Sequence, residues 1–119
     1  MDPRPKTIIC DIDGTLIKHN KPSDVAKDSY LPDLLEGTID KLNEWERRGY
    51  NIILLTGRKE SMRQVTEKQL SQLGIYYDQL IMGAGGGTRY LINDYKPDGT
   101  ESAFAINVER NKGIKDIKI

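Results

Sequence analysis

The sequence predicts a single α/β domain with a mainly parallel sheet flanked by helices, and three observations support this prediction. Short apolar runs that suit buried strands alternate with longer segments of helical spacing, which is the pattern of strand–helix–strand units. The chain has 119 residues, enough for one domain with a modest core. No internal repeat or change of composition divides it, so we expect residues 1–119 to form one domain.

The expected strands are short runs of apolar residues. Residues 7–12 form the first and end in acidic residues, and residues 51–55 form a continuous apolar run typical of a parallel strand buried on both faces. Residues 78–82 and 89–92 predict a third and a fourth strand, and an edge strand is expected near residues 102–107.

Two helices are expected between these strands. Over residues 34–48 the apolar side chains recur on one helical face (Leu35, Ile39, Leu42 and Trp45), and Gly49 follows as a stop signal. A second helix is expected over residues 60–73, with Gly74 as its cap. Residues 18–33 are polar and contain two prolines, which predicts a loop or flap.

The composition gives no support to several classes of protein. Lys and Arg together number 18 and so do Asp and Glu, so the sequence shows no basic excess to support a nucleic-acid or membrane surface. No segment has the roughly 18 apolar residues of a membrane span, and the N-terminus lacks the apolar stretch of a signal peptide. Cys10 is the only cysteine and is expected to be a buried small hydrophobe. A cytoplasmic protein is therefore expected.

Polar residues follow three of the expected strands. Asp11 and Asp13 end the first, Thr56 follows the second, and Asn93 and Asp94 follow the fourth. Because ligands of parallel sheets bind beyond the carboxyl ends of the strands, we expect these residues to share one edge of the sheet.

The pair Asp11 and Asp13 suggests phosphoryl transfer. Two crowded carboxylates favour a cation between them, and oxygen ligands suit Mg²⁺. One carboxylate can then attack phosphorus while the other exchanges protons with the leaving oxygen and water, and Gly14 permits the sharp turn that exposes both. The alternatives are that the aspartates only form a turn, or that they belong to a calcium loop, although the longer ligand series of such a loop is missing.

Phosphate binding is the second inference from the strand ends. Thr56, Gly57 and Arg58 offer a hydroxyl and backbone N–H groups before a helix, which suits a phosphate, although Thr56 alone also fits a plain helix cap. Arg89 and Lys96 flank the second acidic site, where a cation is needed to neutralise the phosphoryl group, although most such side chains are simply solvated.

These segments resemble the haloacid dehalogenase-like (HAD) superfamily. Residues 11–16 (Asp-Ile-Asp-Gly-Thr-Leu) are similar to its first motif, residues 54–58 (Leu-Leu-Thr-Gly-Arg) to its second, and residues 91–94 (Leu-Ile-Asn-Asp) to its last. The resemblance covers roughly residues 7–98 and implies a Rossmann-like fold and a Mg²⁺ cofactor.

The same resemblance implies roles for single residues. Asp11 would be the nucleophile, and Asp13 the general acid and base, with its backbone carbonyl on the metal. Thr56 would bind the phosphoryl group, and Asp94 would complete the metal site. A second acid two positions after the nucleophile is the phosphatase version of the motif.

Two departures from the superfamily pattern affect the site. The lysine that usually precedes the last motif is missing from residues 83–87, so Arg89 or Lys96 would replace it, and we favour Lys96. The last motif commonly has two acids, whereas this chain has Asn93 before Asp94; the Asn93 amide oxygen would be the weaker metal ligand.

The segment between Asp13 and Thr56 is too short for the cap domain that many relatives carry. An uncapped site is open, which predicts a large substrate or a homo-oligomer in which a neighbouring subunit covers the site. The loop of residues 18–21, which includes the only histidine, His19, is the best candidate to reach the substrate, although His19 also fits a solvated loop residue.

The function predicted from these features is a Mg²⁺-dependent phosphatase that hydrolyses a small phosphorylated substrate, such as a sugar phosphate or another metabolite, through an aspartyl-phosphate on Asp11. The main alternative is a catalytically idle relative that binds phosphorylated ligands. A phospho-receiver domain is disfavoured, because it needs its phosphoacceptor aspartate after the third strand, where this chain has Met82 and Gly83. A nucleotide-binding Rossmann domain is weaker still, because the glycines of residues 83–87 open no evident helix.

Overall fold

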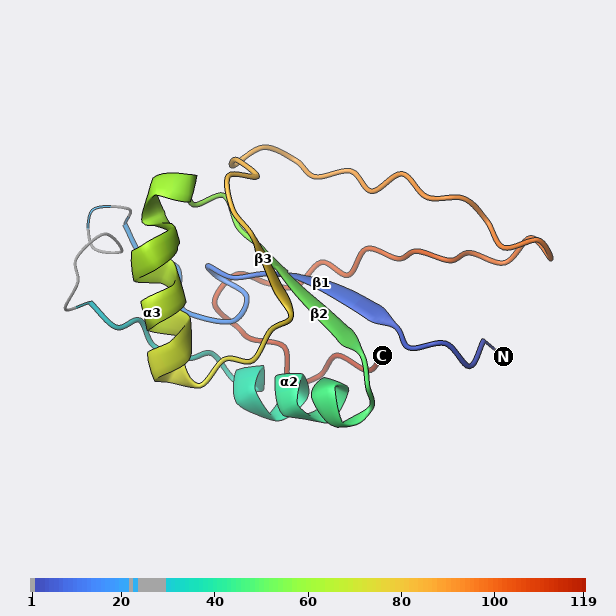
Figure 1. Ribbon diagram of the computed structural model, residues 1–119, viewed down its shortest axis with the longest axis horizontal. Helices are drawn as coiled ribbons and strands as arrows, with labels where there is room; N and C mark the ends of the chain where they lie inside the picture. Colours follow the sequence, from blue (N-terminus) through green and yellow to red (C-terminus); the bar gives the residue numbers. More distant parts are fainter. Residues whose placement is uncertain (1, 22, 24–29) are drawn as a thin grey trace.

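A computed structural model describes residues 2–21, 23 and 30–119 of the chain (Figure 1). Part of the expected flap, residues 22 and 24–29, lies outside the described residues. The elements follow in the order β1 (Thr7–Asp11), α2 (Thr38–Arg47), β2 (Asn51–Leu55), the 3₁₀ helix η1 (Glu60–Met62), α3 (Arg63–Leu73) and β3 (Gln79–Ile81).

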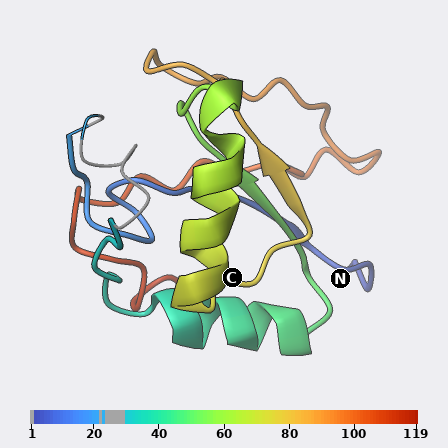
Figure 2. The ribbon, with the colours of Figure 1, turned by 60° about the vertical axis from the view of Figure 1, so that its left-hand side comes forward.

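The three strands form one parallel sheet in the order β1–β2–β3. Asp11 at the end of β1 lies opposite Leu55 at the end of β2, and Leu55 lies opposite Ile81 of β3. The residues that follow each strand therefore leave the sheet at one edge. Helices α2 and α3 connect the strands, as Figures 1 and 2 show, so the predicted mainly parallel sheet flanked by helices is confirmed.

Side chains point to alternate faces along a strand, and the core forms on the face that carries Ile8 and Cys10 of β1 and Ile52 and Leu54 of β2. It combines strand residues with residues of both helices and of the C-terminal segment, among them Ile8, Cys10, Ile52, Leu54, Leu42, Trp45, Leu70 and Ile114. Burial raises the pKa of the Cys10 thiol to about 12, which agrees with a core residue. The other face is less covered: Ile53 and Leu55 are half-buried and Ile9 and Ile81 are exposed, so residues 51–55 are fully buried on one face only.

Helix α2 is shorter than the sequence predicts, whereas η1 and α3 together match the predicted second helix. Helix α2 starts at Thr38 instead of residue 34, and the buried Thr38 hydroxyl donates a 2.6 Å hydrogen bond to the Leu16 carbonyl. Helix α3 ends at the left-handed Gly74, as predicted.

The expected strands at residues 89–92 and 102–107 are wrong, because the structure has no strand in either segment. Residues 88–107, here called the arm, instead run away from the sheet and return through a turn at residues 96–100 (Figure 1). A strand needs a paired neighbour, and the apolar pattern of this segment does not supply one. Its large apolar side chains are exposed, Ile92 at 95%. The expectation that a second copy covers the open site stays a prediction.

The C-terminal segment packs onto the rest of the fold. Ile114 is buried in the core, and its N–H donates a 2.9 Å hydrogen bond to the Glu36 carbonyl. At Gly113 an added Cβ would lie 2.2 Å from the Glu36 carbonyl oxygen, so only glycine fits there. In the part of the chain that the structure describes, no helix is long and apolar enough to cross a membrane.

Candidate active site

Asp11 and Asp13 lie on either side of the fully buried Ile12, at the point where β1 ends. The chain turns sharply there: the Gly14 N–H donates a 2.7 Å hydrogen bond to the Ile17 carbonyl, and Gly14 adopts a left-handed φ of 85°. A left-handed backbone strains any residue with a Cβ, so glycine is the residue that suits this turn. The turn leaves both carboxylates partly exposed beside one anchored residue.

Asp11 is held by one neutral and one charged donor. The Thr15 hydroxyl donates to its Oδ2 at 3.3 Å, and Arg89 Nη1 donates to its Oδ1 at 3.0 Å. The Asp11 and Arg89 side chains are 35% and 38% exposed, so this ion pair lies at the surface and a ligand can reach it. Arg89, at the base of the arm, is therefore the predicted cation that the structure brings to Asp11.

Asp13 is held by a buried arginine. Arg58 Nε and Nη2 donate to the two carboxylate oxygens of Asp13 at 3.0 and 2.8 Å. Arg58 is 7% exposed and Asp13 22% exposed, so this two-bond ion pair is shielded from water. Such planar pairing fixes the orientation of a carboxylate as well as its charge. Arg58, which the sequence predicts to bind phosphate, thus contacts Asp13 in the structure, and its phosphate-binding role stays a prediction.

Helix α3 completes the support of Arg58. Arg58 Nη1 donates to Thr66 Oγ1 at 3.0 Å and to Gln69 Oε1 at 2.8 Å, and both residues are almost fully buried. Neither residue is predicted from the sequence as part of the site, because helical spacing marks apolar residues for the inner face of a helix. Their signal is position: Thr66 and Gln69 share the face of Leu70, and buried polar groups need partners.

Thr56 braces the loop after β2. It is buried, its hydroxyl accepts a 3.1 Å hydrogen bond from the Arg58 N–H, and its carbonyl accepts one from the Ala84 N–H. At Gly57 an added Cβ would lie 2.6 Å from the Gly85 carbonyl oxygen, so the glycine-rich loop packs directly against this one. The nearest helical turn begins at Glu60, so Thr56 and Gly57 precede it by a loop. The phosphate-binding roles of Thr56 and Gly57 stay predictions.

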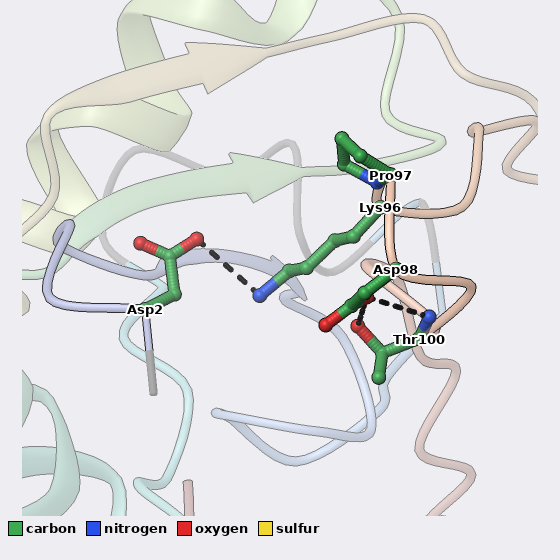
Figure 3. Close-up of a pocket in the computed structure, with 5 residues that line it drawn as sticks. All are labelled: Asp2, Lys96, Pro97, Asp98 and Thr100. Carbon is green, nitrogen blue, oxygen red and sulfur yellow. Dashed lines mark hydrogen bonds and ion pairs between the residues drawn. The ribbon is translucent and has the colours of Figure 1, made fainter.

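Lys96 lies at the turn of the arm, away from Asp11. Its Nζ is 3.3 Å from Asp2 Oδ2, in a hollow lined by Asp2, Lys96, Pro97, Asp98 and Thr100 (Figure 3). Hydrogen bonds from Arg4, with a smaller contribution from Lys96, hold the pKa of Asp2 well below its usual range. The geometry therefore favours Arg89 over Lys96 as the cation of the site.

The last two predicted metal ligands also lie on the arm. Asn93 Nδ2 donates to Ser102 Oγ at 2.7 Å, and Asp94 is exposed. Among the described residues, no three His, Cys, Asp or Glu side chains come close enough to hold a metal ion together. The oxygen donors of Asp11 and Asp13 suit Mg²⁺ in kind, but the structure does not join Asp94 to them.

A further segment reaches the Asp13 turn from the end of the chain. The Asn111 N–H donates to the Gly14 carbonyl at 2.8 Å, and Asn111 Oδ1 accepts a 2.8 Å hydrogen bond from the His19 N–H. Asn111 adopts a left-handed φ of 64°, which asparagine tolerates better than most residues. This contact is not predicted from the sequence, because its one local signal is an asparagine two residues before Gly113.

Comparison with known proteins identifies similar domains and folds. A family model described as the polynucleotide kinase PNKP phosphatase domain matches residues 5–91, more than half of the chain. No curated protein sequence matches. A chain in the structure of the Pnkp1/Rnl/Hen1 complex is 34% identical, with a TM-score of 0.58, over 72% of this chain and 30% of that one.

Two further structures agree on the fold. A chain of the Pnkp1/Rnl/Hen1 RNA repair complex is 34% identical, with a TM-score of 0.56, over 79% of this chain and 28% of that one. A crystal structure from Vibrio cholerae is 21% identical, with a TM-score of 0.53, over 78% and 85% of the two chains, and shows likeness of fold alone. The present chain thus spans less than a third of the length of the two repair-complex chains.

Proposed function

The chain belongs to the polynucleotide kinase PNKP phosphatase domain family of the HAD superfamily, and we propose that it hydrolyses phosphate monoesters through Asp11. One observation supports this proposal most strongly. Two carboxylates flank a single buried residue, and each is held by its own arginine, Asp11 by Arg89 and Asp13 by Arg58. This arrangement gives the two acids different surroundings, which suits two different chemical roles.

In the first half of the reaction, an Asp11 carboxylate oxygen attacks phosphorus. The bond between phosphorus and the leaving oxygen breaks, and a proton from Asp13 goes to that oxygen, which leaves an aspartyl-phosphate on Asp11. Arg89 lies against the attacking carboxylate, where it also faces the charge of the incoming phosphoryl group.

In the second half, Asp13 takes a proton from water, and the water oxygen attacks phosphorus. The bond between phosphorus and Asp11 breaks, so inorganic phosphate leaves, the Asp11 carboxylate returns and Asp13 is protonated again. Arg58 acts through Asp13: its two hydrogen bonds hold the Asp13 carboxylate in place during both proton transfers.

We include Mg²⁺ in the proposal as a cofactor. The Asp11 carboxylate and the Asp13 backbone carbonyl would hold it, with Asn93 and Asp94 as the further ligands that the superfamily pattern implies. A bound Mg²⁺ would neutralise charge on the phosphoryl group.

Hydrolysis of 4-nitrophenyl phosphate tests this proposal. We expect turnover with Mg²⁺ and its loss in EDTA, with recovery when excess Mg²⁺ is restored. Turnover that is unaffected by EDTA would contradict the metal requirement. Absence of turnover in every condition, together with measurable phosphate binding, would favour the idle phospholigand-binding protein.

Arg89 and Lys96 give a second prediction, which reverses the order that the sequence alone favours. We expect Arg89→Ala to lower kcat/KM for 4-nitrophenyl phosphate by about 10- to 100-fold, because the removed cation contacts Asp11. Lys96→Ala should stay within about 2-fold of the wild type, because Lys96 pairs with Asp2. A larger loss in Lys96→Ala would mean that the arm moves Lys96 to the site during turnover.

Two classes of substrate are candidates. A sugar phosphate or another small phosphorylated metabolite fits an open site on a chain without net charge. The family model favours a second candidate, the phosphorylated end of a polynucleotide. Turnover of a panel that contains both kinds of ester separates them.

A further inference from the structure

A basic side chain from the end of the protein lies against the turn that presents Asp13. A Cβ built on Gly14 would lie 3.1 Å from Arg110 Cγ and 3.7 Å from His19 Cβ. Arg110 and His19 therefore pack against Gly14, the residue that follows the general acid, and both are exposed to solvent. Neither residue has a role in the mechanism above.

Asn111 fixes this arrangement. Its N–H bonds Gly14 and its side chain bonds the His19 N–H, so one residue joins two segments that lie 92 positions apart in the chain. The core anchors the same segment three residues later, at Ile114. Arg110 is thus held next to the catalytic turn by backbone contacts on its C-terminal side and is not on a free tail.

The charges around the turn leave Arg110 without an acidic partner. Asp11 is paired with Arg89 and Asp13 with Arg58, so the two catalytic acids are already matched. Across the described residues, Arg110 makes no ion pair, whereas Arg58, Arg63 and Arg89 each make at least one. Arg110 therefore adds a positive charge without an ion-pair partner beside Asp13, and such a charge attracts an anion.

We propose that Arg110, assisted by His19, binds a second phosphate group on the leaving-group side of the substrate. This inference rests on the proposed function, in which Asp13 protonates the leaving oxygen and therefore faces the leaving group. A guanidinium binds phosphate oxygens through paired N–H groups, and imidazole supplies a further donor. The preferred substrate is accordingly a phosphate monoester whose leaving group bears a second phosphate.

Two sources supply this chemistry. In a hexose bisphosphate the second group is a phosphomonoester, and in a 3′-phosphorylated dinucleotide it is the phosphodiester. Glucose 1,6-bisphosphate and a 3′-phosphorylated dinucleotide therefore serve as the two probes, and 4-nitrophenyl phosphate, which lacks a second anion, serves as the reference substrate.

The test compares kcat/KM for the three substrates in wild type, Arg110→Ala, Arg110→Lys and Arg47→Ala. Arg47 is the control, because it is an exposed arginine at the end of α2 and has no role in the proposed site. We expect Arg110→Ala to lower kcat/KM about 10- to 100-fold, mainly through KM, for at least one probe with a second phosphate. The reference substrate should change by less than about 2-fold. Lysine should restore part of the loss, and Arg47→Ala should have no effect.

Two results would overturn the inference. An equal loss on all three substrates would show that Arg110 only supports the turn, and no loss on either phosphate-bearing probe would show that it binds neither. The reference substrate tests the proposed function separately, because its turnover needs no second anion. Should no substrate turn over, binding of glucose 1,6-bisphosphate and of the dinucleotide to wild type and Arg110→Ala decides the inference: equal affinities for both ligands reject it.

Discussion

Replacement of Asp11 by Asn is expected to lower turnover of 4-nitrophenyl phosphate by at least about 10³-fold, because an amide cannot form the aspartyl-phosphate. The substitution keeps the shape of the side chain and its hydrogen bond with Thr15. It removes the charge that pairs with Arg89, but both side chains are more than a third exposed, so the loss of stability should be about 1 kcal/mol or less. Steady-state kinetics and thermal unfolding measure the two effects.

The matched control is Asp33→Asn, because Asp33 is an exposed aspartate that does not follow a strand of the sheet. It should leave both turnover and stability near the wild-type values. Turnover close to wild type in Asp11→Asn would remove Asp11 as the nucleophile, whatever the stability of the variant.

The second large effect is expected for Arg58→Ala. This change removes four hydrogen bonds and leaves the Asp13 carboxylate and the buried Thr66 and Gln69 side chains without their arginine. Removing one partner of a shielded ion pair exposes the desolvation cost of the other, so we expect a loss of about 2–4 kcal/mol in the free energy of unfolding. Turnover should fall by about 10²-fold or more, since Asp13 loses its fixed orientation.

Arg58→Lys and Arg47→Ala are the controls for this prediction. Lysine keeps the charge but not the planar pair of donors, so it should recover part of the stability and little of the turnover. Arg47→Ala should change neither. If Arg58→Ala does not fold, the lysine variant still tests the claim, and wild-type turnover in a folded Arg58→Lys protein would contradict the positioning role.

The parts of the fold that local patterns encode could be predicted from the sequence. The apolar run at residues 51–55 is a strand with those bounds, and the helix predicted over residues 60–73 matches η1 and α3. Both signals are local, because the spacing of apolar residues and a terminating glycine are features of a few neighbouring residues. The arm could not be predicted in this way. Its residues have strand composition, but a strand also requires a neighbour to pair with, and the choice of neighbour is not local.

In the candidate site, too, local features could be predicted from the sequence and contacts between distant segments could not. Asp11, Asp13 and Gly14 are close in sequence, so their joint exposure at the end of β1 follows from a strand and a turn. The contact between Arg58 and Asp13 depends instead on how α3 packs against the sheet, because Thr66 and Gln69 of α3 also bind Arg58. A local sequence pattern does not predict this packing.

The C-terminal segment shows the same limit. Its residues are mainly polar, yet the segment contacts both the core and the turn after β1. Ile114 enters the core, Ile117 and Ile119 pack against it, and the Asn111 N–H bonds the Gly14 carbonyl in the turn after β1. The Asn111 contact has no periodic signal, because it rests on one residue in one backbone conformation.

The proposed mechanism depends on an aspartyl-phosphate at Asp11, and chemical trapping detects this intermediate. Asp13→Asn protein should accumulate this intermediate with 4-nitrophenyl phosphate and Mg²⁺, because removal of the general base slows attack by water. Borohydride reduces an acyl phosphate to an alcohol, so peptide mass spectrometry should then find homoserine at position 11. Homoserine at another aspartate, or unmodified Asp11 in protein that releases nitrophenol, would contradict the account.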